Sequence, residues 1–221
     1  MMEDMTEEEL KAIASQLRCP DGDMGVEIGN MMNDSNISMT LKAIESLDLS
    51  DHDEVFELGH GNCRHLPEIL GKAVNIKYTG LDISELMNIE AKKINAGYIE
   101  NGVADYYLYD GNTFPFKDGL FNKVFTVNTI YFWENPDDTL KEIHRVMRSG
   151  GIFSLAFAQA ESMRNLPFTS YGFEMYDTED IVKLLSQVSF KIKNIDDVSE
   201  KVESKTGDSI QRDFTVITSE K

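Results

Sequence analysis

The residues whose types and spacing suggest binding chemistry are a carboxylate and two glycines after an apolar run. Glu57, Gly59 and Gly61 lie at or just beyond the end of the stretch 54–58. Without Cβ atoms, the two glycines let the backbone bend tightly and approach a ligand. A helix that begins just after them would add free N–H groups and a positive potential. These features predict a binding crevice at the carboxyl end of a strand, as in open α/β sheets.

Two kinds of ligand fit such a turn. A dinucleotide site usually reads Gly-x-Gly-x-x-Gly, but the last glycine is replaced by Arg64 here. A pyrophosphate would also disfavour the carboxylate of Glu57 beside it. A ligand with an ammonium group suits that carboxylate better. An NAD-dependent oxidoreductase therefore remains only as an alternative.

Strands and helices alternate from residue 54 onward, and this alternation positions the turn. The predicted strands are 54–58, 77–82, 104–109, 123–128 and 151–158, with helices at 64–72, 85–96 and 136–147. Such a βαβ pattern predicts a parallel sheet covered by helices. A helix at 178–187 and strands near 190–196 and 212–218 follow. A polar segment with Gly207 and Asp208 joins these two strands, which are too close for a helical crossover and are predicted to be antiparallel.

The N-terminal segment is predicted to be helical but interrupted. Thr6 and Glu9 form a capping box before an amphipathic stripe, and the residues from Pro20 to Asp23 end that helix. The small polar stretch 29–36 is predicted to be turn-like, and a short helix is expected at 38–47. We expect residues 1–50 to form a helical lid and 51–221 the ligand-binding domain.

The pattern Glu57-x-Gly59-x-Gly61 resembles motif I of the class I S-adenosylmethionine (SAM)-dependent methyltransferases. Four later segments resemble that family's signatures in order: 78–84 with Asp82, 109–116 with Asp110, 121–128, and 140–151 with its paired glycines. The departures are Cys63 in place of a frequent third glycine, Asn122 in place of aspartate and Ser149 in place of proline. The resemblance spans 54–158 and is greatest to the ubiquinone/menaquinone-methyltransferase-like branch that acts on small molecules.

The resemblance implies a Rossmann-like α/β fold, with a seven-stranded, mostly parallel sheet, an antiparallel last strand and N-terminal lid helices. It implies SAM as the cofactor and S-adenosylhomocysteine as the product. Glu57 would meet the ammonium, Asp82 the ribose hydroxyls, and Asp110 with its neighbour the adenine. The full set of predicted cofactor-binding residues is Glu57, Gly59, His60, Gly61, Asp82, Ile83, Asp110, Gly111 and Asn128.

Methyl transfer from a sulfonium needs mainly alignment, because the leaving group is neutral and already activated. The catalytic candidates are Asn128, Tyr131 and His65. Aromatic residues in the loop 159–176 provide either a hydrophobic lid or ordinary packing: Phe168, Tyr171, Phe173 and Tyr176. Asn30 and Asn36 in the stretch 29–36 could contact the cofactor if that stretch closed over it.

The amino-acid composition disfavours several classes of binding partner. A net charge of −18 disfavours nucleic acid and anionic membranes. Two cysteines without metal-ligand spacing predict no metal site and fit a reducing cytoplasm. The start of the chain lacks signal-peptide features, and no apolar stretch approaches the roughly 20 residues of a membrane span. The prediction is a cytoplasmic methyltransferase for a small-molecule acceptor, with a homodimer allowed. A non-catalytic SAM-fold binding or regulatory protein is the other alternative.

Overall fold

The computed structural model describes residues 5–203 and 209–221. The predicted connection at Gly207 and Asp208 lies outside the described residues, as do residues 1–4 of the stretch considered for a signal peptide. None of the helices in the described ranges is both long and apolar enough to cross a bilayer.

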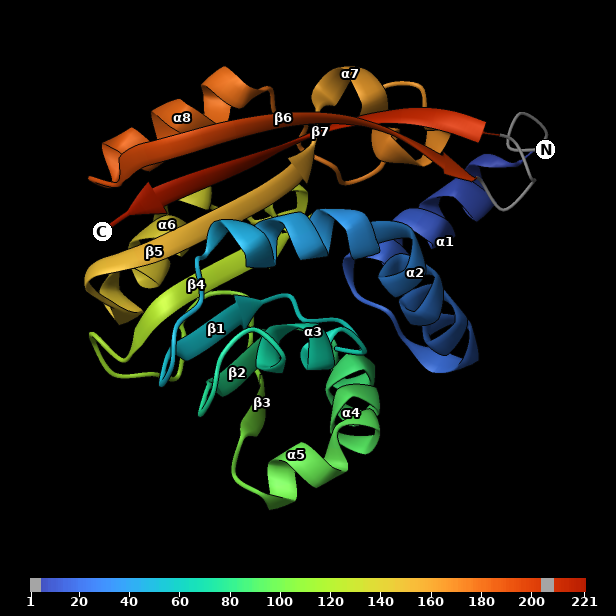
Figure 1. Cartoon of the computed structure of the whole chain (residues 1–221). Coiled ribbons are helices and arrows are strands. Elements are labelled where there is room, and N and C mark those ends of the chain that lie inside the picture. Colours follow the sequence, from blue (N-terminus) through green and yellow to red (C-terminus); the bar gives the residue numbers. More distant parts are fainter. Residues whose placement is uncertain (1–4, 204–208) are drawn as a thin grey trace.

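A seven-stranded sheet forms the centre of the molecule, in the order β3-β2-β1-β4-β5-β7-β6 (Figure 1). Its strands are β1 (Glu54–Leu58), β2 (Lys77–Asp82), β3 (Ala104–Leu108), β4 (Phe121–Val127), β5 (Met147–Ala158), β6 (Lys191–Glu203) and β7 (Ser209–Glu220). The pairs among β1 to β5 are parallel, and β7 is antiparallel to both β5 and β6. The predicted fold class is confirmed.

The strand order reverses at β1, which pairs with β2 on one side and β4 on the other. Crossover helices leave in opposite directions at such a point, so a crevice opens at the carboxyl ends of these strands. The glycine turn follows β1 directly. The topology therefore places the turn where a ligand can reach it.

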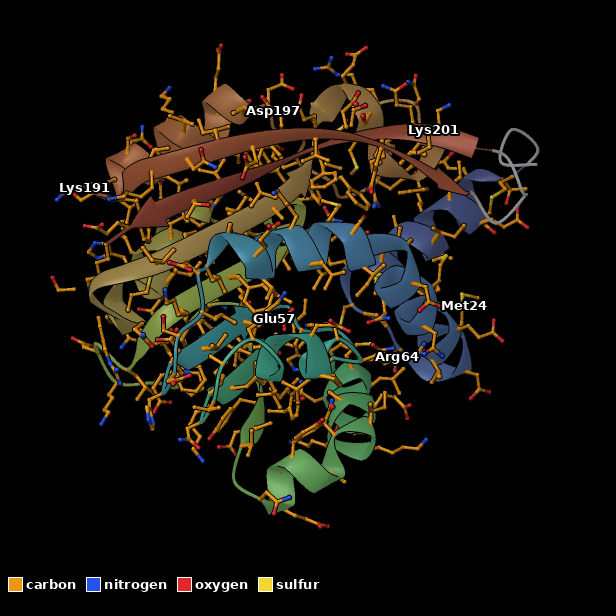
Figure 2. The ribbon with its side chains drawn as sticks, viewed as in Figure 1. Met24, Glu57, Arg64, Lys191, Asp197 and Lys201 are labelled. Atoms are coloured by element: carbon orange, nitrogen blue, oxygen red, sulfur yellow. The ribbon has the colours of Figure 1, made fainter. Side chains whose placement is uncertain are left out.

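Helices cover both faces of the sheet. They are α1 (Glu7–Arg18), α2 (Gly22–Ser46), α3 (Leu66–Leu70), α4 (Glu85–Ile94), α5 (Ala96–Glu100), α6 (Pro136–Val146), α7 (Ala160–Met163) and α8 (Thr178–Gln187). Alternation along β1 sends Val55 into the apolar cluster under α2, α3 and α4, and Phe56 into the cluster under α6 and α8. Glu57 therefore shares the face of Val55, and Figure 2 shows it below α2.

The prediction of a turn at 29–36 and a short helix at 38–47 is wrong. Both stretches belong to the continuous 25-residue helix α2. Gly25 and Gly29 resemble helix breakers in sequence, but they are contact points with α4. An added Cβ would lie 2.7 Å from Leu86 at Gly25 and 2.8 Å from Met87 at Gly29. Packing of α2 against α4 thus overrides the low helix propensity of glycine and asparagine.

Other predicted boundaries need smaller corrections. The capping box of Thr6 and Glu9 is confirmed, and Asp21 caps α2. The helix predicted at 85–96 ends at Ile94, and Asn95 separates it from α5. Strands β6 and β7 are longer than predicted because they continue to pair with each other beyond the part of β7 that pairs with β5.

Candidate functional site

A cavity of about 370 Å³ lies at the carboxyl ends of β1, β2 and β4. Helices α1 and α2 form its other side, through residues such as Leu17, Met32 and Asn36. Figure 2 shows Glu57 between β1 and α2. The structure gathers all nine predicted cofactor-binding residues around this one cavity: Glu57, Gly59, His60, Gly61, Asp82, Ile83, Asp110, Gly111 and Asn128.

The turn after β1 depends on left-handed backbone conformations. Gly59 has φ +78° and Gly61 has φ +55°. A Cβ at Gly59 would lie 2.2 Å from Thr129 Cγ2, whereas a Cβ at Gly61 would enter open space. Cys63, at the position of the absent third glycine, is also left-handed with φ +49°. Gly59 is thus required by packing, and Gly61 keeps the cavity free.

Asp82 holds the turn in place. Its buried carboxylate accepts from the Gly61 amide at 2.9 Å and from the Ser84 amide at 2.8 Å. Ser84 in turn caps α4 and donates to the carbonyl of Pro20 at 2.6 Å. A carboxylate has further acceptor positions beyond these two bonds. Asp82 can therefore fix the turn and accept hydrogen bonds from a ligand.

Glu57 is buried on the cavity wall and is held from beneath. Its Oε2 accepts from His65 Nε2 at 2.9 Å and from the hydroxyl of Tyr78. The ring of His60 lies below the turn, packs against Tyr106, and donates from Nδ1 to the Gly61 carbonyl. Sequence patterns did not indicate Tyr78, because a tyrosine in a buried strand usually signals packing alone.

Asp110 is exposed at the rim of the cavity. Backbone amides of Asn112 and Thr113 donate to its Oδ1 at 2.9 and 3.3 Å, and these bonds hold the pKa of Asp110 below its usual value. Gly111 next to it has φ +89°, and the nearest atom to an added Cβ is in Ile83 at 3.9 Å. An anionic group and bare backbone thus lie side by side at this edge.

The three catalytic candidates lie in different settings. Asn128 has φ +55° and donates to Asn36 Oδ1 at 3.1 Å. The Tyr131 hydroxyl donates to Asn128 Oδ1 at 2.9 Å, and burial raises the pKa of Tyr131. Asn128 and His65 line the cavity, while Tyr131 lies behind Asn128. A direct part in catalysis stays a prediction for each of them.

The mouth of the cavity has lining residues that the sequence analysis did not single out. Arg18 Nη2 lies 3.4 Å from Glu134 Oε1 across the opening, in an exposed pair that contributes little stability. The lining includes none of the four aromatic residues proposed as a lid in the loop 159–176. Phe173, for example, packs edge-on against Phe132 at 4.6 Å between ring centroids. Packing is the reading that the structure supports for this loop.

The two cysteines differ in access to solvent, which predicts different reactivity. Cys63 is fully buried, and burial raises the pKa of its thiol. Cys19 is half-buried, and burial also raises its thiol pKa, to a smaller degree. We expect a disulfide reagent at pH 7.5 to modify only Cys19 in the native protein, and slowly. Both thiols should react in denaturant. Rapid native modification that persists in Cys19→Ser would contradict this assignment.

The sheet order and the flanking helices define a Rossmann-like fold of the methyltransferase type. A family model described as a methyltransferase domain matches residues 56–155. An uncharacterized methyltransferase of Bacillus subtilis (strain 168), YdaC, is 25% identical over 137 residues, which cover 61% of this chain and 72% of that protein. Residues 56–155 thus match a methyltransferase domain, and this match supports the resemblance to the class I SAM-dependent methyltransferases.

One further relative and one solved structure are similar to this chain. The mitochondrial 2-methoxy-6-polyprenyl-1,4-benzoquinol methylase of Dictyostelium discoideum is 30% identical over 115 residues, covering 50% of this chain and 35% of that protein. A methyltransferase of Haloferax volcanii, solved in complex with the Trm112 methyltransferase activator, superposes with a TM-score of 0.73 at 18% identity. That match covers 98% of this chain and 100% of the other, and it shows the shared fold.

Proposed function

We propose that this protein transfers a methyl group from SAM to a small, uncharged acceptor molecule. The observation that supports this most directly is that Glu57, Asp82 and Asp110 line one cavity around a glycine turn. A Cβ at Gly61 would enter open space in that turn, so the backbone is free to meet a ligand. An acidic cavity lining suits a ligand that carries an ammonium and a sulfonium.

The chain's own residues would bind and orient the cofactor. We assign Glu57 to the ammonium, Asp82 to the ribose hydroxyls, and Asp110 with Gly111 to the adenine. When bound, SAM supplies an electrophilic methyl on a sulfonium that leaves as a neutral thioether. The protein then needs mainly to align the acceptor and exclude water.

The acceptor is inferred from the rest of the cavity wall. Leu17, Met32, Phe132 and Trp133 give this part an apolar character. The exposed cation at the mouth, Arg18, lies beside the carboxylate of Glu134, which offsets its attraction for a phosphate or carboxylate. The net charge of −18 further disfavours nucleic acid. An uncharged molecule with an apolar body fits this wall best.

We also propose how the chain is divided into two parts and where in the cell it works. Residues 1–50 act as a helical lid over the SAM-binding unit 51–221, since α1 and α2 contribute cavity residues such as Leu17 and Met32. The enzyme works in the cytoplasm, as the pair of free cysteines, Cys19 and Cys63, suggests.

A ligand panel tests the proposal. At 100 times its Kd, a ligand that binds only the folded state adds about 2.7 kcal/mol of stability. For a chain of this size we expect SAM or S-adenosylhomocysteine to raise the Tm by about 5–10 °C. NAD should leave the Tm unchanged. Labelled SAM with pooled metabolites should then yield a labelled small molecule.

Other outcomes separate the alternatives. Stabilisation by NAD and not by SAM would favour an oxidoreductase. Stabilisation by SAM without transfer to any metabolite or macromolecule would favour a binding or regulatory protein. Transfer to protein or RNA in place of metabolites would overturn the small-molecule acceptor.

A further inference from the structure

A chain of buried polar groups lies beneath the glycine turn and ends on Glu57. The thiol of Cys63 donates to the Tyr78 hydroxyl at 3.2 Å, and that hydroxyl donates to Glu57 Oε2. His65 Nε2 lies 2.9 Å from the same oxygen. Because a carboxylate oxygen accepts and does not donate, Nε2 carries the proton in this pair. The four side chains are buried.

The direction of these hydrogen bonds is set by chemistry. Burial raises the pKa of the Cys63 thiol and of the Tyr78 phenol, so both groups keep their protons. Each proton then points along the chain toward the carboxylate. Glu57 Oε2 is the terminal acceptor for two donors. Among the described residues no donor bonds to the other oxygen, Oε1, and Glu57 lines the cavity.

The geometry points to Tyr78 and His65 as positioning residues that hold Glu57 for the ammonium group of a ligand. They bind Oε2 and leave Oε1 without a donor among the described residues, on a side chain that lines the cavity. The inference rests on the proposed function, since it concerns the amino-acid part of SAM. It assigns to this chain a selectivity for nucleosides that carry an α-amino acid over nucleosides that lack one.

A metal-binding site is the alternative interpretation of these residues. The ligating atoms of Glu57, Cys63 and His65 lie within 4.8 Å of one another. However, Oε2 already accepts two hydrogen bonds, and the thiol is engaged with Tyr78. The donors are thus satisfied by one another without an ion, and a hydrogen-bonded network accounts for their burial.

A pair of ligands isolates the role of Glu57. S-Adenosylhomocysteine carries the amino acid, and 5′-methylthioadenosine has the same nucleoside and a thioether but no amino acid. We expect Tyr78→Phe to weaken binding of S-adenosylhomocysteine about tenfold in calorimetry, because one charge-assisted bond to Glu57 is lost. Binding of 5′-methylthioadenosine should change less than about twofold.

Two further variants sharpen the test. Tyr106→Phe is a matched control, because the Tyr106 hydroxyl is buried on the same sheet face without a hydrogen-bond partner among the described residues. It should leave both affinities unchanged. Glu57→Gln should lower the affinity for S-adenosylhomocysteine itself, and adding Tyr78→Phe to it should have little further effect. His65→Gln, which keeps a donor, should retain more selectivity than His65→Leu.

Several results would overturn the inference. If Tyr78→Phe weakened the binding of both ligands equally, Tyr78 would have a purely structural role. If it changed neither affinity, Tyr78 would have no role in ligand binding. Stabilisation of the native protein by Zn²⁺ that Cys63→Ser abolishes would replace the network by a metal site. If the wild-type protein binds neither nucleoside, the proposed function itself fails. Retained binding of 5′-methylthioadenosine also reports that each variant is folded.

Discussion

Gly59→Ala is expected to abolish detectable binding of SAM and to destabilise the fold. Gly59 has φ +78°, and an added Cβ would lie 2.2 Å from Thr129 Cγ2. The left-handed conformation and the clash together should cost about 3 kcal/mol. For a chain of this size that corresponds to a Tm lower by about 6–12 °C. The turn must also shift, which moves the Gly61 amide away from Asp82.

A matched substitution separates the clash from the backbone strain. Gly102 has φ +62°, but no atom lies within 4 Å of an added Cβ, and it is not among the cavity residues. Gly102→Ala should cost about 1 kcal/mol and leave SAM binding intact. Thr129→Ser removes the clashing methyl and keeps the hydroxyl that meets Thr126. Combined with Gly59→Ala it should restore part of the affinity. If Gly59→Ala alone bound SAM with full affinity, the glycine turn would not be required for binding.

The part of the site that sequence could predict is set by local chain geometry. In a parallel sheet, the carboxyl ends of neighbouring strands meet at one edge. Three acidic residues follow this rule: Glu57 near the end of β1, Asp82 at the end of β2 and Asp110 after β3. Once the strands were recognised, these residues could be predicted to lie near one another. The spacing of glycines that predicted a bend at Gly59 and Gly61 was equally local.

The course of α2 could not be predicted, because its cause lies far along the chain. Gly25 and Gly29 have low helix propensity, and their close contacts with Leu86 and Met87 favour the helical course. Those contacts join residues about 60 positions apart, which no local pattern encodes. The same holds for Asn36, which reaches the site because α2 passes over Asn128.

The roles of aromatic residues were ambiguous for a related reason. Tyr78 in a strand and Phe173 in a loop both signal apolar packing by type alone. The structure gives Tyr78 a carboxylate partner and packs Phe173 against the rings of Tyr131 and Phe132. The difference depends on which tertiary neighbour each ring meets. A polar tip on an aromatic side chain is thus a functional signal only once its partner is known.

Asp82→Ala is expected to lower both the ligand affinity and the stability of the fold. Asp82 accepts two hydrogen bonds from the backbone, and we propose that it also binds the ribose. Loss of the bonds from the Gly61 and Ser84 amides should lower the free energy of unfolding by about 3 kcal/mol. The turn then loses its anchor and the ribose loses its acceptor. We expect the affinity for S-adenosylhomocysteine to fall at least about 100-fold in calorimetry.

Asp82→Asn separates the two roles, since its single carbonyl oxygen can keep one backbone bond while the charge is gone. Its stability should lie between that of the wild type and Asp82→Ala, but its affinity should still fall by about tenfold or more, because a neutral amide accepts ribose hydroxyls less strongly. Asp105→Ala, at an exposed position on the neighbouring strand β3, controls for the loss of one negative charge and should change neither quantity. If Asp82→Asn binds the nucleoside as tightly as the wild type, Asp82 only supports the turn, and the ribose must be held by other residues of the cavity.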